Sequence, residues 1–330
     1  MAESNSRVQI NDEDMVPVLR HEFIAGTAFA SDVFVKLTEN NYILVARAGD
    51  KANLKELQLS DEITFLFVKK TEFKNFVGQS LAIAGVMMNR EGLAADKKAI
   101  FISKASASVY KELTLLGINF ESLEHARLVA NNVKALVELN KDVFSLMELF
   151  AANCVGQIDF SLASSMVSVS IAKKMGWNMN STLEKISLGC LLQDVGMKEL
   201  PTILLTKPRL ELTNEERSLF ETHPFRGAEI LRAIPEISDE VVSVVYEHHE
   251  NADGTGYPRR IKDLKMNPLA KVVAMANAVC ELTIKTKDNP SPRTASQAIT
   301  YIEVTLGQPF NEQAFEALKG LFGISQAKAS

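Results

Sequence analysis

The pattern of apolar residues changes at about residue 122, and this change most limits how the chain can fold. From there onward apolar residues recur at the spacing of amphipathic helices, whereas earlier short apolar runs alternate with turn residues. A chain of 330 residues is also longer than one compact core usually supports. The sequence therefore predicts a multi-domain protein: a small N-terminal α/β domain at residues 1–121, followed by an all-α helical bundle at residues 154–330.

The N-terminal region carries short strand patterns with helical patterns between and after them. The runs VFVKL (33–37) and YILVA (42–46) flank an Asn-rich turn and predict a β-hairpin. Two further apolar runs, at 63–68 and 100–103, are typical of buried strands. We predict a regulatory or sensory role for this domain.

Residues 122–153 keep helical spacing over many turns and predict one long connecting helix. A helix buried in the core would show the same pattern. A long helix between two domains can also form a dimer surface, so a homodimer is one interpretation of this segment.

The C-terminal region carries explicit helix boundaries. STLE (181–184) and TNEE (213–216) match the capping box, and Asn267-Pro268 matches a cap followed by proline at the first helical position. The residue before a proline disfavours helical backbone, so a helix is predicted to end at His223. These boundaries predict about six or seven helices.

Composition excludes some classes of function. A formal charge of −5 argues against a basic DNA-binding surface, and no run approaches the roughly 20 apolar residues that span a bilayer. The polar N-terminus has no apolar signal segment, so we expect a cytoplasmic protein. Cys154, Cys190 and Cys280 lie far apart in apolar stretches and are expected to be buried thiols.

Four polar residues in the helical region suit a metal ion. Asp194 ends an apolar helix, where an unpaired buried carboxylate would be costly, although a capping role is the simpler interpretation. His223, His248 and His249 are three of only five histidines and lie near predicted helix ends. Three imidazoles and one carboxylate suit Fe, Mn or Zn with a position open to water. Adjacent helical histidines point about 100° apart, so they can serve two metals, or one can orient the other.

A glycine-rich turn follows the histidine pair. Asp253-Gly254 and Gly256 favour a tight turn, and Tyr257-Pro258 closes it. A simple loop after a helix explains the glycines but gives no reason for the adjacent histidines.

The stretch HHENADGTGYP (248–258) resembles the signature of HD-GYP domains: His-His-Glu, two variable residues, then Asp-Gly-x-Gly-Tyr-Pro. The flanking CLLQDVGMKELP, ILLTKPRLELTNEERSLFETHPFRGAEIL and NPLAKVVAMANAVCELT resemble further segments of that family, so the resemblance covers about residues 150–320. It implies an all-helical domain that hydrolyses cyclic di-GMP with two or three metal ions.

Carried onto this chain, the resemblance retains one metal position and loses most of another. The retained ligands, here called the histidine site, are Asp194, His223, His248 and His249. At the neighbouring position Gln193 replaces a histidine, Asn277 replaces an aspartate, and Phe160 stands near the place of an early histidine. We call these three residues the amide site. Asp159 is an adjacent substitute ligand, and Met197 replaces a phosphate-directed lysine.

The implied function is a degenerate HD-GYP protein, weakly active or inactive, that acts as a nucleotide- or partner-binding module. We expect one well-bound divalent ion, Fe or Mn before Zn, because amide oxygens hold a second ion only weakly. The expected ligand is cyclic di-GMP or pGpG, and the expected protein partner is a diguanylate cyclase, which would contact the loop at residues 253–258. One alternative is an active phosphodiesterase that uses Asp159, Gln193 or Asn277 as an atypical ligand. Another is a scaffold that binds neither metal nor nucleotide.

Overall fold

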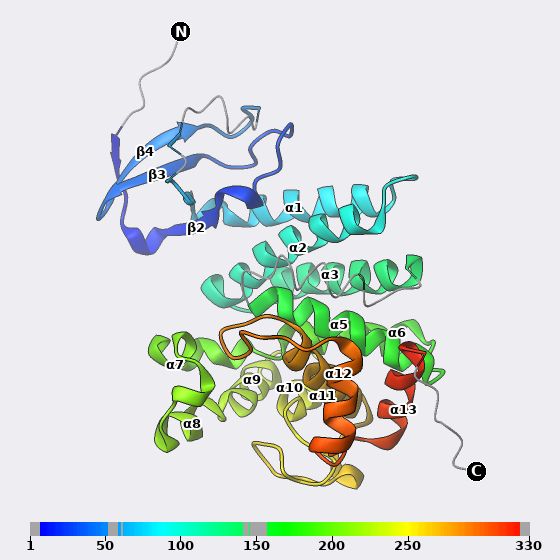
Figure 1. The fold of residues 1–330 in the computed structure, drawn as a ribbon. Helices are drawn as coiled ribbons and strands as arrows, with labels where there is room; N and C mark the ends of the chain where they lie inside the picture. Colours follow the sequence, from blue (N-terminus) through cyan, green and yellow to red (C-terminus); the bar gives the residue numbers. More distant parts are fainter. Residues whose placement is uncertain (1–6, 52–58, 61, 141–144, 146–156, 324–330) are drawn as a thin grey trace, which may run out of the picture.

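The computed structural model describes residues 7–51, 59–60, 62–140, 145 and 157–323. Its elements form successive layers, from a sheet at the N-terminal end, through a stack of helices, to a helical bundle (Figure 1). The predicted order, a small α/β region followed by an all-α region, is confirmed.

The sheet has five antiparallel strands in the order β1-β4-β3-β5-β2. The strands are β1 (Arg7–Gln9), β2 (Met15–Leu19), β3 (Val33–Thr38), β4 (Asn41–Ala46) and β5 (Phe65–Lys69). The predicted hairpin is therefore confirmed as β3 and β4, and Asn40 in its turn adopts a φ of 57°, a conformation that asparagine tolerates.

Helices α1 (Phe73–Met88) and α2 (Ala95–Lys111) follow the sheet, and a π-helical turn at Glu112–Leu116 extends α2. The strand predicted at 100–103 is wrong, because these residues lie inside α2. Ala99, Ile102 and Ala105 are buried at helical spacing. A run of four apolar residues is too short to distinguish the two periods.

Helix α3 (Phe120–Leu139) corrects the predicted long connector. It ends at Asn140, whose backbone is extended (φ −123°, ψ 123°), so one continuous helix to residue 153 is wrong. The rest of that segment lies outside the described residues, apart from residue 145. The apolar face of α3 packs against α2, α5 (Gln157–Lys174) and α6 (Asn180–Leu192). This face is therefore covered within one chain, and the homodimer remains a prediction.

The C-terminal bundle has more helices than the six or seven expected. After α5 and α6 come α7 (Thr202–Thr206), α8 (Asn214–Phe220), α9 (His223–Arg232), α10 (Asp239–Glu247), α11 (Pro268–Thr283), α12 (Ala295–Thr300) and α13 (Glu312–Leu321). Short 3₁₀ helices include η5 (Val195–Glu199), η6 (Arg209–Glu211) and η7 (Asp263–Lys265). The largely buried α11 contacts α5 and α10.

Two predicted helix starts are confirmed. The Thr213 and Glu216 side chains form a capping box at α8. The Asn267 side chain accepts a hydrogen bond from the Leu269 N–H at the start of α11.

Two other predicted boundaries are wrong. Helix α6 begins at Asn180, one residue before the expected cap Ser181, because the extended residue is Met179. His223 begins α9 instead of ending a helix. Proline is tolerated in the first helical turn, where its missing N–H would have no partner within the helix.

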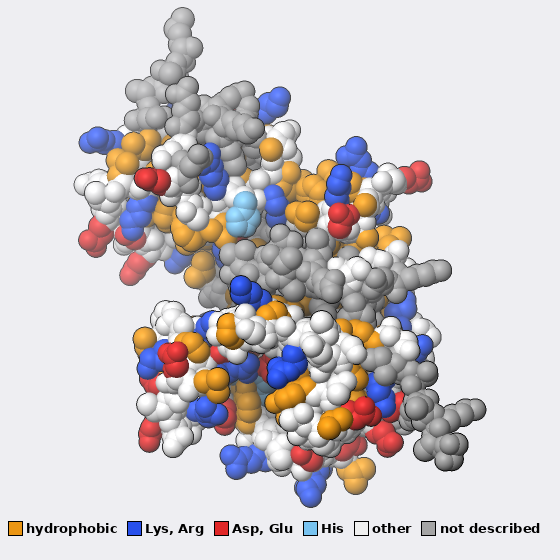
Figure 2. All heavy atoms as spheres, in the orientation of Figure 1, with side chains coloured by type: hydrophobic (Ala, Val, Ile, Leu, Met, Phe, Trp, Pro, Cys, Tyr) orange, Lys and Arg blue, Asp and Glu red, His pale blue; other side chains and the backbone are white. Residues whose placement is uncertain are grey.

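A single cluster of buried apolar side chains extends from Val16 in β2 to Leu318 in α13 and includes α3. The division into domains at residues 121 and 154 remains a prediction. Cys190 and Cys280 are buried free thiols, as expected, whereas Cys154 lies outside the described residues. No described helix is both long enough and apolar enough to cross a bilayer. On the face shown in Figure 2, basic and acidic side chains are interspersed.

Candidate metal centre

Two helix boundaries bring three histidines together. His223 is the first residue of α9, His248 follows the last residue of α10, and His249 comes next. One ring nitrogen from each lies within 4.8 Å of the others. His223 and His248 are buried, whereas His249 is half-buried and lines a cavity.

Close backbone contact places Asp194 beside these histidines. Asp194 directly precedes η5, which packs against the start of α9. A Cβ atom on Gly196 would lie 2.1 Å from the His223 carbonyl oxygen and 2.4 Å from the Gly227 nitrogen, so only glycine fits. The Asp194 Oδ1 atom consequently lies 3.5 Å from His223 Nε2 and 3.9 Å from His248 Nε2.

Backbone carbonyl groups determine which ring nitrogens carry hydrogen. His223 Nδ1 lies 2.9 Å from the Phe220 carbonyl oxygen, and His248 Nδ1 lies 2.7 Å from the Val245 carbonyl oxygen. A carbonyl oxygen can only accept, so each Nδ1 donates and each neutral ring presents a lone pair at Nε2. These two Nε2 atoms lie 3.3 Å apart.

This arrangement suits a cation between the rings. Burial lowers the pKa of His248 to about 4, and burial together with the neighbouring His248 lowers the pKa of His223 well below its usual value. At neutral pH no proton therefore bridges the two lone pairs. Ligand atoms about 2.1 Å from one tetrahedral ion lie about 3.4 Å apart, close to the observed spacing. The histidine site fits a divalent metal.

The two amide side chains of the amide site are hydrogen-bonded to each other. Asn277 Nδ2 donates to Gln193 Oε1 at 3.0 Å and lies 3.4 Å from the His248 carbonyl oxygen. Asn277 Oδ1 accepts a hydrogen bond from the Ser164 hydroxyl. The side chains of Ser164, Gln193 and Asn277 are buried. Both amide oxygens already accept one hydrogen bond, and neutral amides hold a divalent cation only weakly, so the arrangement disfavours a metal ion here.

The other candidates at this position lie in different places. Phe160 and Met197 line the cavity beside Gln193. Asp159 is buried, and its carboxylate accepts a hydrogen bond from Ser103 in α2 at 2.8 Å. Asp159 is therefore held toward the N-terminal helices and is not among the residues that line the cavity.

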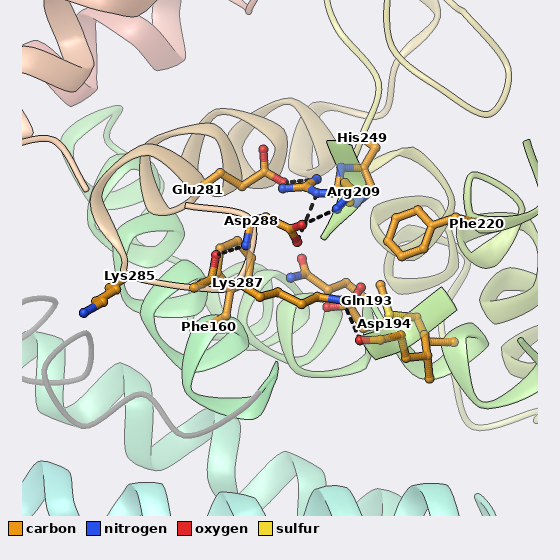
Figure 3. A pocket seen from close by; sticks show the side chains of 13 residues that line it. Phe160, Gln193, Asp194, Arg209, Phe220, His249, Glu281, Lys285, Lys287 and Asp288 are labelled. Atoms are coloured by element: carbon orange, nitrogen blue, oxygen red, sulfur yellow. Dashed lines mark hydrogen bonds and ion pairs between the residues drawn. The ribbon is translucent and has the colours of Figure 1, made fainter. Parts of the chain in front are cut away.

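A cavity of about 480 Å³ opens beside both sites (Figure 3). Its lining includes both signs of charge. The charged residues are Asp194, Arg209, Glu281, Lys285, Lys287 and Asp288. A cavity of this volume falls within the range of small-molecule sites.

The glycine-rich loop packs back onto the histidines. A Cβ atom on Gly256 would lie 2.3 Å from the His249 carbonyl oxygen, so the backbone approach requires glycine. The Tyr257 ring stacks on the His249 ring with centroids 4.6 Å apart. Asp253 remains exposed at the turn, where its carboxylate accepts a hydrogen bond from the Thr255 N–H.

Comparison with known proteins decides the family. A model of the HD domain family matches residues 125–311. Cyclic di-GMP phosphodiesterases of Pseudomonas aeruginosa and Thermotoga maritima are 31% and 29% identical over 167 and 152 residues, which is 50% and 46% of this chain. The chain belongs to the HD-GYP group of the HD domain family.

This HD-GYP chain covers only 39% and 40% of the length of those two relatives. Among solved structures, an HDG"Y"P protein of Bdellovibrio bacteriovorus superposes with a TM-score of 0.68 at 17% identity, covering 94% of this chain and 100% of the other. At that identity the similarity concerns the fold alone.

Sequence reasoning missed one anchor of the glycine-rich loop at residues 253–258, here called the HD-GYP loop. Glu250 is fully buried, and its carboxylate accepts hydrogen bonds from the backbone N–H groups of Arg259, Arg260 and Ile261 at 2.6–3.1 Å. Glu247 likewise binds the Arg259 side chain at 3.1 Å and the Asn267 N–H at 2.7 Å. The HHE motif contained the signal for Glu250, because a buried glutamate needs several donors.

Sequence reasoning also gave no role to the cavity residues Arg209 and Lys287. Arg209 stands in KPR, where the resembled family pattern reads Lys-Pro-Gly. Lys287 lies in KTKDNPSPRT, which replaces an Arg-Pro-Tyr stretch of that pattern. Both departures were visible in the sequence, but their direction toward the cavity was not.

Proposed function

We propose that this protein is a cyclic-dinucleotide-binding HD-GYP module with one metal position and little or no hydrolytic activity. The hydrogen bond between Gln193 and Asn277 is the observation that carries the proposal. It occupies the place where the family resemblance implies a second ion. A single ion clamps the attacking and leaving oxygens of a phosphodiester less well than two.

The ligand class follows from the relatives. Two are named as cyclic di-GMP phosphodiesterases, and one of Vibrio cholerae, 28% identical over 131 residues, is named as a 3′3′-cGAMP-specific phosphodiesterase. We propose cyclic di-GMP, or the linear product pGpG, as the ligand of the cavity beside Asp194 and His249. Stacking surfaces of Phe160 and Phe220 and basic side chains line this cavity.

The metal would be held by the histidine site: Asp194, His223, His248 and His249. Iron or manganese suits imidazole with carboxylate, and zinc suits it as well. When bound, such an ion acts as a Lewis acid on a phosphate oxygen. The backbone carbonyl groups of Phe220 and Val245 orient the His223 and His248 rings for this role, because they hold each ring in the tautomer with its lone pair at Nε2.

We further propose that the HD-GYP loop contacts a diguanylate cyclase and that residues 1–121 regulate this interaction. The exposed side chains of Asp253 and Thr255 at the loop tip support a contact with a protein partner. The inward packing of Tyr257 on His249 would make that contact sensitive to the state of the metal centre.

Retention of the whole histidine site supports the alternative of an active phosphodiesterase with an atypical set of ligands for two metal ions. One experiment separates the two. Protein purified without oxygen and supplied with Mn or Fe is assayed for metal content, cyclic di-GMP binding and hydrolysis. We expect one equivalent of metal, measurable binding and turnover at least about 100-fold below that of a complete HD-GYP enzyme. Comparable turnover would refute the degenerate function, and absence of binding would refute the module.

A further inference from the structure

Two basic side chains, Arg209 and Lys287, line the cavity together with the carboxylates of Glu281 and Asp288. Arg209 Nη1 donates to Glu281 Oε1 at 2.9 Å, and Arg209 Nε lies 3.3 Å from Asp288 Oδ2. The Asp288 carboxylate also accepts a hydrogen bond from the Arg209 backbone N–H. Two carboxylates thus hold the plane of the guanidinium, and no contact with a described residue occupies its Nη2 donors.

Lys287 extends across the same cavity. Figure 3 shows its side chain directed toward Gln193, whereas the side chain of Lys285 points away. The Lys287 ammonium donates to the carbonyl oxygens of Leu205 and Lys207 on the opposite wall. Burial lowers the pKa of Lys287. Among the described residues no carboxylate forms an ion pair with this ammonium, although the nearby charge of Asp288 acts on it.

The turn that presents Lys287 is rigidly built on the end of α11. The backbones of Thr286 and Asn289 exchange hydrogen bonds of 3.1 and 3.2 Å. The Asn289 side chain donates to the carbonyl oxygens of Glu281 and Ile284. The ammonium is therefore positioned before a ligand arrives, which lowers the entropy cost of binding.

Arg209 stands where two hollows meet. The cavity of about 480 Å³ and a second hollow of about 370 Å³ share Arg209, Phe220, Glu281 and Asp288 in their linings. The second hollow also contacts Tyr257 of the HD-GYP loop. An extended ligand that occupies both hollows passes the guanidinium.

We propose that Arg209 and Lys287 form a phosphate-binding subsite that works without a metal ion, on the side of the cavity next to the amide site. The subsite rests on the proposed nucleotide-binding function and names the group that this cavity recognises. The guanidinium presents the N–H donors of Nη2 to a phosphate, with its plane held by the two carboxylates. The lysine exchanges two neutral carbonyl acceptors for a charged one, which strengthens its hydrogen bonds.

The test uses the full chain after removal of metal with EDTA. Calorimetric titration with pGpG, cyclic di-GMP and inorganic pyrophosphate is carried out on the wild type and on K287Q, R209K and K285Q. K285Q is the matched control, because Lys285 lies two residues away at the edge of the same cavity but its side chain points away from Gln193 and Arg209. Thermal melting of each variant establishes that it is folded.

We expect the metal-free wild type and K285Q to bind pGpG with equal affinity, and likewise pyrophosphate. K287Q and R209K should bind each ligand at least about tenfold more weakly than the wild type. Equal affinities for K287Q and K285Q would overturn the subsite, as would binding that vanishes on removal of metal. Pyrophosphate binding without binding of either cyclic di-GMP or pGpG would leave the subsite standing and reject the proposed function. Cyclic di-GMP binding that is insensitive to both variants would do the reverse.

Discussion

The Nε2 atoms of His223 and His248 lie 3.3 Å apart inside the bundle, and each presents a lone pair to the other. Their Nδ1 atoms are committed to the Phe220 and Val245 carbonyl groups, so neither ring can turn its hydrogen toward its neighbour. Two facing acceptors in a buried space are unfavourable unless a cation separates them. The facing nitrogens therefore destabilise the folded protein when no metal is bound, and they are already positioned as ligands when a metal binds.

Replacing His223 or His248 with alanine should abolish tight metal binding. Each change removes one of the two facing nitrogen ligands, and we expect metal affinity to fall by more than about 100-fold. Elemental mass spectrometry on protein purified without oxygen measures the bound equivalents. H21A is the control, because His21 is exposed in the N-terminal region. Unchanged metal content in both H223A and H248A would rule out the histidine site.

The triple variant F160H/Q193H/N277D should gain a second ion. It replaces the hydrogen-bonded amides and the apolar ring by imidazole and carboxylate ligands, which bind divalent cations far more strongly. Metal content should rise from one to two equivalents. N277D alone is the control and should stay at one, because it supplies a single ligand. A wild type that already holds two tightly bound ions would contradict the role assigned to the amide pair.

E250Q should destabilise the protein by about 1–3 kcal/mol. The Glu250 carboxylate accepts hydrogen bonds from backbone N–H groups, and in the variant an amide NH₂ would face an N–H donor instead of accepting from it. Urea denaturation measures this loss, and amide hydrogen exchange should accelerate at residues 259–261. The isosteric D253N, at an exposed loop position, should change stability by less than about 0.5 kcal/mol. Equal effects of the two variants would show that the buried carboxylate does not anchor the loop.

The stability difference between wild type and H125Q should shrink as pH rises. His125 Nδ1 lies 2.8 Å from Glu112 Oε2, and this hydrogen bond raises the pKa of His125 above its usual 6.5. A raised pKa in the folded state stabilises the protein below 6.5, and this contribution is lost as pH rises through the folded value. Urea denaturation at pH 6 and pH 9 measures the difference. A difference that grows with pH would contradict the pairing.

Much of the local architecture could be predicted from residues close in sequence. The hairpin of β3 and β4, the caps at Thr213 and Asn267 and the succession of amphipathic helices each depend on neighbouring side chains and on backbone preference. The errors at residues 100–103 and at His223 arose where local patterns admit two solutions. Packing against other elements then selects one of them.

By itself the sequence determined that the chain forms a helical bundle with a scarce set of histidines beside a glycine turn. Only the tertiary structure decided how the polar side chains of the histidine site and the amide site are arranged. The bond between Gln193 and Asn277 joins residues 84 positions apart, and the facing nitrogens of His223 and His248 belong to residues 25 apart. Local preference specifies where helices begin and end, but the direction of a buried polar side chain depends on partners supplied by distant segments.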